Sequence, residues 1–89
     1  MRARRVVISG RVQGVGYRDW LVAEAHELGV AGWVRNRADG AVEALLYGDT
    51  EVLQELLRAC RRGPRLAVVS RIEEEWADPP AEPGFCRLG

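Results

Sequence analysis

Residues 10–18 read Gly-Arg-Val-Gln-Gly-Val-Gly-Tyr-Arg, and this stretch joins a β-branched run to a helical pattern through glycines. A glycine-rich turn lets successive backbone N–H groups point to one place, and the helix N-terminus that follows adds partial positive charge. Arg18 adds a planar fork of donors, although its charge is unfavourable at that end of a helix. The stretch therefore predicts a strand, a tight turn and a helix that together bind an anion such as a phosphoryl or carboxylate group.

Apolar periodicity on either side of this stretch predicts the remaining helices and strands. Gly29 is placed to end the first helix, Asp39-Gly40 is a strong hairpin signal, and either Asp49 or Thr50 can cap the second helix before Gly63-Pro64 stops it. The expected strands are 5–12, 30–36, 41–47 and 67–76, with a short edge strand at 85–88, and the expected helices are 17–28 and 50–62.

This order predicts an α+β fold, the ferredoxin-like βαββαβ sandwich, in which two helices cover one face of an antiparallel sheet. A short C-terminal edge strand extends the sheet, whose other face stays open. Val42, Ala44 and Leu46 alternate with Glu43, so one face of that strand is expected to be buried. The run Glu73-Glu74-Glu75 is expected to be a solvated strand end.

Length and composition restrict what the chain can be. Its 89 residues suffice for one domain with a single core, and 47% of them are apolar. Thirteen basic residues balance thirteen acidic ones, which argues against a protein that mainly coats nucleic acid. All thirteen basic residues are arginine, so a Schiff-base lysine or a phosphate-loop lysine is excluded. No apolar run is long enough for a membrane span or a signal peptide, and we expect a cytoplasmic protein.

The two cysteines and the single histidine give no sign of metal or redox chemistry. Cys60 continues the apolar stripe of the second helix and is expected in the core, whereas the environment of Cys86 stays open. Neither lies in a CxxC pair, and cytoplasmic thiols usually stay reduced. His26 lies opposite the apolar stripe of the first helix and is expected in solvent. It has no Ser, Cys or Asp partner nearby, so it is a poor candidate for a catalytic residue.

Two motifs, GRVQGVGYR at 10–18 and GWVRNRADGAVEALLYG at 32–48, resemble those of the acylphosphatase family. The resemblance covers essentially the whole chain, including the Gly63-Pro64 turn and the closing strand at Phe85. Two motifs in the right order and separation are far more specific than a lone glycine pattern. The resemblance implies a single acylphosphatase-like domain over residues 1–89.

The resemblance also implies an activity, the hydrolysis of small acyl phosphates to a carboxylate and inorganic phosphate, without metal, cofactor or covalent intermediate. Arg18 would bind the phosphoryl group and Asn36 would position the attacking water. Tyr17 departs from the phenylalanine usual in the family, so its hydroxyl must find a partner or water. The backbone N–H groups expected to bind phosphate are those of Gly14, Val15, Gly16, Tyr17 and Arg18.

Elementary chemistry is compatible with this interpretation. An acyl phosphate has a stabilised carboxylate as leaving group, so no general acid is needed, and a ring of N–H donors with a guanidinium suits the charge on the equatorial phosphoryl oxygens. The amide of Asn36 can hold a water but is not a base.

Other interpretations are open at this stage. Arg18 could be an ordinary surface arginine, and Asn36 could simply begin the 37–40 turn. The chain could be a non-catalytic anion-binding module on the same fold, or it could bind single-stranded RNA on the open sheet face, although the strand at 5–12 carries no aromatic residue. We favour an enzyme that acts on a small molecule as a monomer, with no nucleic acid or membrane partner.

Overall fold

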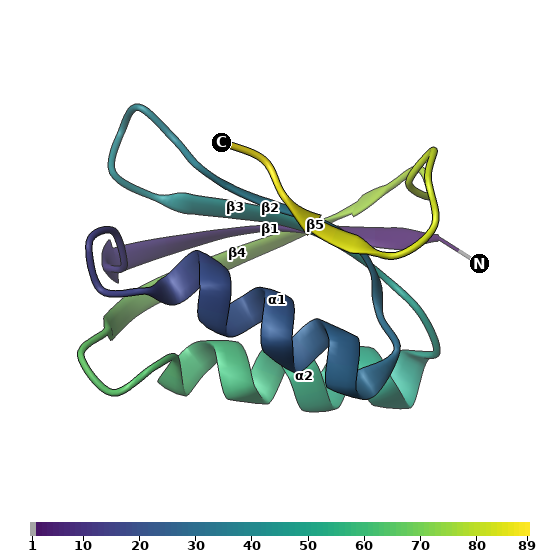
Figure 1. Cartoon of the computed structure of the whole chain (residues 1–89), viewed down its shortest axis with the longest axis horizontal. Coiled ribbons are helices and arrows are strands. Elements are labelled where there is room, and N and C mark those ends of the chain that lie inside the picture. Colours follow the sequence, from purple (N-terminus) through teal and green to yellow (C-terminus); the bar gives the residue numbers. More distant parts are fainter. Residues whose placement is uncertain (1) are drawn as a thin grey trace.

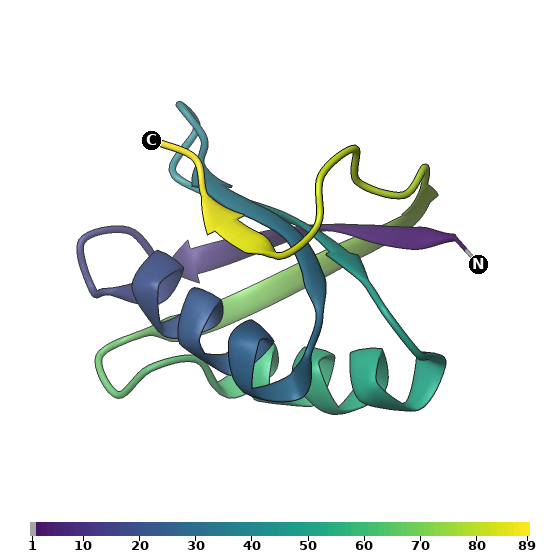
Figure 2. The same ribbon diagram turned by 45° about the vertical axis from the view of Figure 1, so that its right-hand side comes forward.

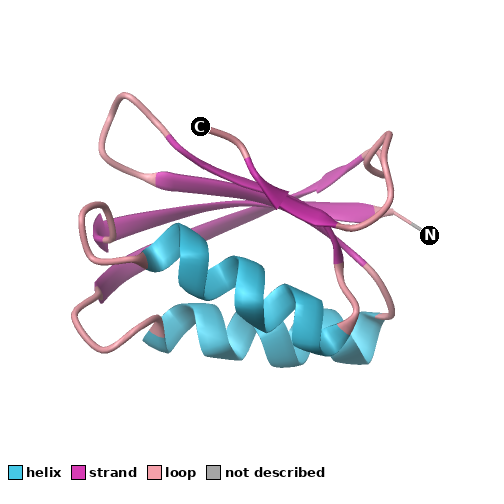
Figure 3. Ribbon diagram, in the orientation of Figure 1, coloured by secondary structure: helices cyan, strands magenta, loops and turns pink. Residues whose placement is uncertain are grey.

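The computed structural model describes residues 2–89 and arranges them as two helices packed on one face of a twisted sheet (Figures 1 and 3). The order along the chain is strand, helix, strand, strand, helix, strand, strand, as the sequence predicts. The elements are β1 (Ala3–Arg11), α1 (Tyr17–Leu28), β2 (Ala31–Asn36), β3 (Val42–Tyr47), α2 (Thr50–Arg62), β4 (Val68–Ala77) and β5 (Phe85–Arg87).

The sheet has the strand order β4-β1-β3-β2-β5. β1 is antiparallel to β3 and to β4, β2 is antiparallel to β3, and only the short β5 runs parallel to its neighbour β2. This topology confirms the ferredoxin-like sandwich and the C-terminal edge strand. It also brings the loop after β1 and the β2–β3 turn to the same end of the sheet, as the two ribbon views agree (Figures 1 and 2).

The helices lie where the sequence predicts them, and only the start of α2 is stabilised differently from what the sequence suggests. Gly29 ends α1 in the left-handed conformation, with φ of 70°. Asp49 occupies the N-cap position of α2, yet its side chain makes no capping hydrogen bond, so that part of the prediction is wrong. The stability of α2 comes instead from its apolar face.

The core lies between the helices and the sheet. α2 contributes Leu53, Leu56, Leu57 and Cys60, and the thiol is fully buried as predicted. α1 contributes Tyr17, Leu21 and Ala25. The other buried core residues come from the strands and their connections: Val6, Ile8, Val12, Val30, Val34, Val42, Ala44, Leu46 and Phe85.

Glu43 is the buried acidic residue of the open sheet face, with only 2% of its surface exposed. One buried face was expected for β3, but Glu43 and Leu45 on the other face are buried as well. Arg5 and Arg35, from the two neighbouring strands, both form ion pairs with the carboxylate, that of Arg35 at 2.7 Å. Burial alone would raise the pKa of Glu43, but the Arg35 hydrogen bond and the two arginine charges outweigh it and lower that pKa.

The three consecutive glutamates lie in the second half of the last long strand and are exposed, as the sequence predicts. Glu73, Glu74 and Glu75 lie within β4, a long edge strand, and are exposed there. Glu74 pairs with Arg4 at 2.9 Å and Glu75 with Arg5 at 2.6 Å, both across the β1–β4 ladder. Charges at an edge discourage pairing with another sheet. In residues 2–89 neither helix is long and apolar enough to cross a membrane.

Candidate active site

The loop between β1 and α1 presents backbone N–H groups that have no acceptor among the described residues 2–89. Gly14 and Gly16 have φ of 74° and 79°, and a β carbon at either position would meet no atom within 4 Å. Left-handed backbone, rather than lack of space, is therefore what favours glycine here.

The N–H groups of this loop are followed directly by those of the helix start. Among residues 2–89, no loop or cap hydrogen bond uses the N–H of Gly14, Val15 or Gly16 as donor, whereas the Gly16 carbonyl accepts from Trp20 at 3.0 Å and so begins α1. The N–H groups of Tyr17 and Arg18 open the helix and have no intrahelical acceptor. The N–H groups of the loop and of the helix start together carry partial positive charge, which suits the binding of an anion.

Arg18 lies in the first turn of α1, beside the C-terminal segment. Its Nη1 donates to the backbone carbonyl of Gly89. Two further contacts hold that segment in place: Arg87 pairs with Asp19 at 2.8 Å, and the Leu88 N–H donates to the Val34 carbonyl at 2.8 Å. Sequence reasoning missed this contribution to the orientation of Arg18, because nothing local to residues 87–89 signals it.

Asn36 is the last residue of β2, and its amide oxygen is buried with no hydrogen-bond partner in the part of the chain described. Buried polar atoms are normally satisfied by protein or water, so this oxygen is suited to hold a water or a polar ligand.

The β2–β3 turn does not depend on the Asn36 side chain. Its side-chain hydrogen bond comes from Asp39, whose Oδ1 accepts from the Ala41 N–H at 3.0 Å and whose pKa is lowered mainly by that bond. Arg37 adds an ion pair to Asp39 at 3.0 Å. The alternative that Asn36 is present only to form the turn is therefore weakened.

Gln13 links the loop to the hairpin, a contact that the sequence did not reveal. Its Nε2 donates to the carbonyl of Arg37 at 2.8 Å and to that of Ala41 at 3.0 Å. These bonds place Gln13, which precedes the loop, beside the residue that follows Asn36 at the end of β2. Nothing in the sequence around Gln13 signals a contact with residues so far along the chain.

Tyr17 anchors the start of α1 in the core, where 1% of its surface is exposed. Its hydroxyl donates to the Cys60 carbonyl at 2.6 Å, so the partner that its hydroxyl requires is a backbone group of α2. The ring packs against Trp20 with centroids 5.2 Å apart.

Burial is the main influence on the pKa values of the Tyr17 hydroxyl and the Cys60 thiol. It raises the pKa of the Tyr17 hydroxyl and, as the largest influence, raises the pKa of the Cys60 thiol to about 12. Cys60 is consequently a structural residue rather than a nucleophile.

Gly63 makes room for the Tyr17 ring. A β carbon at Gly63 would lie 2.8 Å from Cε2 of Tyr17, and its φ is 68°. The Gly63-Pro64 turn therefore has a steric reason to begin with glycine, and it fixes the far side of the aromatic ring that supports the loop.

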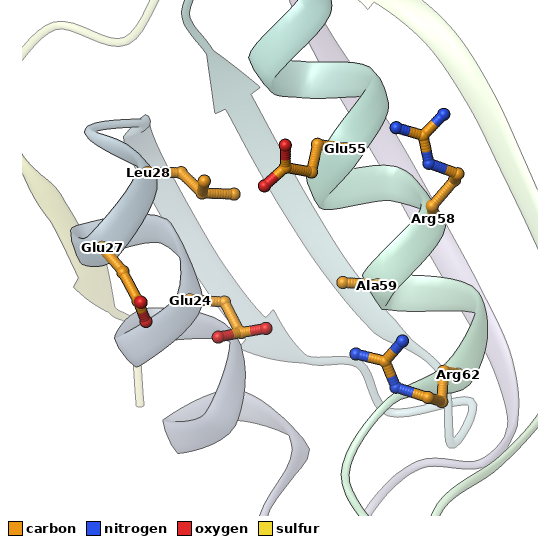
Figure 4. A pocket seen from close by; sticks show the side chains of 7 residues that line it. All are labelled: Glu24, Glu27, Leu28, Glu55, Arg58, Ala59 and Arg62. Carbon is orange, nitrogen blue, oxygen red and sulfur yellow. The ribbon is translucent and has the colours of Figure 1, made fainter.

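Two cavities differ in their relation to these residues. An open cavity of about 510 Å³ reaches Asn36 and is lined also by Arg5, Arg35, Arg37, Ala38, Asp39 and Glu43. A second, of about 380 Å³, lies between the two helices and is lined by Glu24, Glu27, Leu28, Glu55, Arg58, Ala59 and Arg62 (Figure 4). None of the predicted site residues lines the second cavity.

The remaining polar residues add no further chemistry to the site. His26 is exposed as expected, and its Nε2 lies 2.9 Å from the Phe85 carbonyl. Both cysteines are free thiols, Cys86 being exposed. Across residues 2–89, the His, Cys, Asp and Glu side chains form no group of three or more that could hold a metal ion.

Comparison with known proteins gives a consistent result. The acylphosphatase family model matches residues 4–86. An acylphosphatase of Acidiphilium cryptum is 62% identical over 87 residues, covering 98% of this chain and 96% of its own. The crystal structure of acylphosphatase from Bacillus subtilis superimposes with a TM-score of 0.93 at 34% identity over the full length of both chains. The structure of an acylphosphatase from Coxiella burnetii superimposes with a TM-score of 0.92 at 31% identity, covering 98% of this chain and 92% of the other.

Proposed function

This chain belongs to the acylphosphatase family, and on that basis we propose that Arg18 and the 14–18 backbone bind the phosphoryl group while Asn36 positions the attacking water. The activity itself is that of the family: hydrolysis of an acyl phosphate to a carboxylate and inorganic phosphate. The proposal concerns which residues perform it and how.

The phosphoryl group is bound by donors that are in place before it arrives. The unpaired N–H groups of the loop and the helix start face the equatorial oxygens, where charge accumulates in a loose transition state. The Arg18 guanidinium adds a full positive charge and a second pair of donors. Fixed donors need little reorganisation during the reaction, which is why such sites stabilise transition states well.

The observation that carries the assignment of Asn36 is its buried amide oxygen without a partner. This oxygen accepts a hydrogen bond from the water and orients a water lone pair toward phosphorus. The water oxygen then bonds to phosphorus as the bond between phosphorus and the acyl oxygen breaks. The bonding electrons leave with the carboxylate, and the proton of the water passes to a phosphoryl oxygen.

No acidic or basic side chain of the protein transfers a proton in these reaction steps. A carboxylate is a good leaving group and departs without a proton. The substrates are small acyl phosphates. The proposed contacts bind the phosphoryl group, which all acyl phosphates share. We further propose that the protein works as a monomer in the cytoplasm, which its free thiols Cys60 and Cys86 support.

Two variants test the assignment with benzoyl phosphate as substrate and inorganic phosphate as competitive inhibitor. We expect Arg18→Ala to lose both phosphate inhibition and turnover, and Asn36→Ala to keep the inhibition constant for phosphate within about threefold while kcat falls at least a hundredfold, on the scale that misplacement of a reacting group produces. Arg58→Ala, an exposed arginine of α2, is the matched control. Wild-type hydrolysis by either folded site variant would refute the corresponding role.

A further inference from the structure

The side-chain amide of Gln13 bridges the two halves of the site. Both of its N–H bonds are used on the hairpin: Nε2 lies 2.8 Å from the Arg37 carbonyl and 3.0 Å from the Ala41 carbonyl. Gln13 directly precedes the loop that begins at Gly14, and Arg37 directly follows Asn36. One side chain therefore connects a position next to the phosphoryl donors with a position next to the water-binding amide.

The hairpin does not need Gln13 in order to form. The Arg37 N–H donates to the Ala41 carbonyl at 2.8 Å, and the Ala41 N–H donates to Asp39. The β2–β3 ladder continues to the pair Asn36 and Val42. These bonds are all internal to residues 31–47 and fix the shape of the hairpin. The β1–β3 ladder joins the hairpin to β1 as far as the pair Ile8 and Val42, and Gln13 adds bonds to the turn beyond the end of that ladder.

The position of Asn36 relative to the loop is consequently set from outside its own side chain. The Asn36 amide oxygen has no protein partner among residues 2–89, so no hydrogen bond to that oxygen aims it. What fixes the amide is the backbone at residues 36 and 37, and Gln13 holds the carbonyl of Arg37. Reacting atoms must approach to about 3–3.5 Å, and a displacement of about 1 Å lowers rates about a hundredfold.

We propose that Gln13 is a positioning residue that sets the separation between the phosphoryl-binding loop and Asn36. This inference rests on the roles proposed above for the loop and for Asn36. Gln13 itself touches neither the phosphoryl group nor the water. Its removal leaves the loop donors able to bind phosphate and leaves the hairpin formed, but the bound water no longer lies in line with the bond that breaks.

The experiment replaces Gln13 by methionine, which has similar length and no donor, and follows kcat and the inhibition constant for inorganic phosphate separately. We expect kcat for benzoyl phosphate to fall at least tenfold, while the phosphate constant changes by less than about threefold. Gln13→Asn, which keeps the amide on a shorter stem, tests the same point if the methionine variant folds poorly, and the same split is expected. Circular dichroism and urea unfolding establish that each variant is folded.

Gln54→Met is the matched control, because it makes the same substitution at an exposed glutamine of α2, away from the bridge. Its kcat should stay within about twofold of the wild type if only the bridge matters. The Asn36 side-chain NH₂ signals in a ¹⁵N spectrum give a readout independent of turnover. We expect them to shift in Gln13→Met and to stay in place in Gln54→Met.

Three outcomes would overturn the inference: a Gln13→Met kcat within twofold of the wild type, a phosphate constant that rises in parallel with the loss of kcat, or an equal loss of kcat in Gln54→Met. The first with an inactive Asn36→Ala would refute the role of Gln13 alone. An active Asn36→Ala would refute the proposed function instead, whatever Gln13 does.

Discussion

The hydroxyl of Tyr17, the first residue of α1, donates a hydrogen bond of 2.6 Å to the backbone carbonyl of Cys60 in the last turn of α2. The last four carbonyls of a helix lack intrahelical donors, so this hydroxyl satisfies a group that burial would otherwise leave unpaired. The bond ties the base of the phosphoryl loop to the second helix. It gives a structural reason for a hydroxyl on the aromatic ring at position 17.

We expect Tyr17→Phe to destabilise the protein by about 1–2 kcal/mol, since the Cys60 carbonyl loses its partner while the ring stays packed. Because the hydroxyl points into the core, kcat should change less than about twofold. Urea unfolding and steady-state kinetics measure the two effects. Tyr47→Phe, at a half-buried tyrosine of β3, is the control and should cost less than about 0.5 kcal/mol. A large loss of kcat at unchanged stability would instead assign the Tyr17 hydroxyl to the chemistry.

Gly14→Ala should lower both stability and phosphate binding, whereas Gly29→Ala should lower stability alone. The two glycines have φ of 74° and 70°, and a β carbon meets nothing within 4 Å at either. The backbone strain is thus matched, at about 1–2 kcal/mol. Only at Gly14 does relaxation of φ turn N–H groups away from the anion. Phosphate inhibition constants for the two variants decide the matter, and equal constants would mean that the loop does not bind phosphate.

Glu43→Gln should destabilise the protein by about 2 kcal/mol at pH 7, because two arginines lose a buried carboxylate. The folded state lowers the pKa of Glu43 from its ordinary value of 4.5. Its contribution is therefore complete above that value and is lost as the pH falls through the lower folded pKa. The difference in unfolding free energy between the two proteins should narrow as the pH falls below 4.5. A gap that stays constant down to pH 3 would contradict this explanation.

Removal of divalent metal should leave hydrolysis of benzoyl phosphate unchanged, because Arg18 and the loop N–H groups are proposed to carry the charge stabilisation. The measurement is kcat/KM before and after incubation with EDTA, followed by elemental analysis of the treated protein. Loss of activity that Mg²⁺ restores would show that these donors do not suffice and would require ligands beyond those proposed.

Much of the fold was predictable because it is encoded locally. The apolar spacing of α1, the glycine at its end and the Asp39-Gly40 turn each specify an element from neighbouring residues. The burial of Glu43 was not predictable in this way. Its alternation with Val42 and Ala44 indicates only the face it occupies, whereas its burial depends on Arg5 and Arg35, which the sheet register brings from two other strands.

In the candidate site, too, the residues could be predicted from local sequence but their long-range contacts could not. Arg18, Asn36 and the loop glycines could be named from two contiguous motifs, and their roles stay predictions until the variants are measured. The contacts that orient them could not be named. Gln13 reaches carbonyls 24 and 28 residues away, and Gly89 accepts from Arg18 across 71 residues. Local patterns carry no information about such partners.

The place of β1 in the sheet has a consequence for the timing of folding. β1 pairs on one side with β4, and the hydrogen bond between Arg4 and Glu74 joins residues 70 positions apart. The entropy of closing so long a loop must be lost before the contacts form, which slows folding relative to a chain with local pairings. The phosphoryl loop follows directly on β1. Activity during refolding is thus acquired at the pace at which distant parts of the chain meet, and not at the faster pace at which the loop and its helix form.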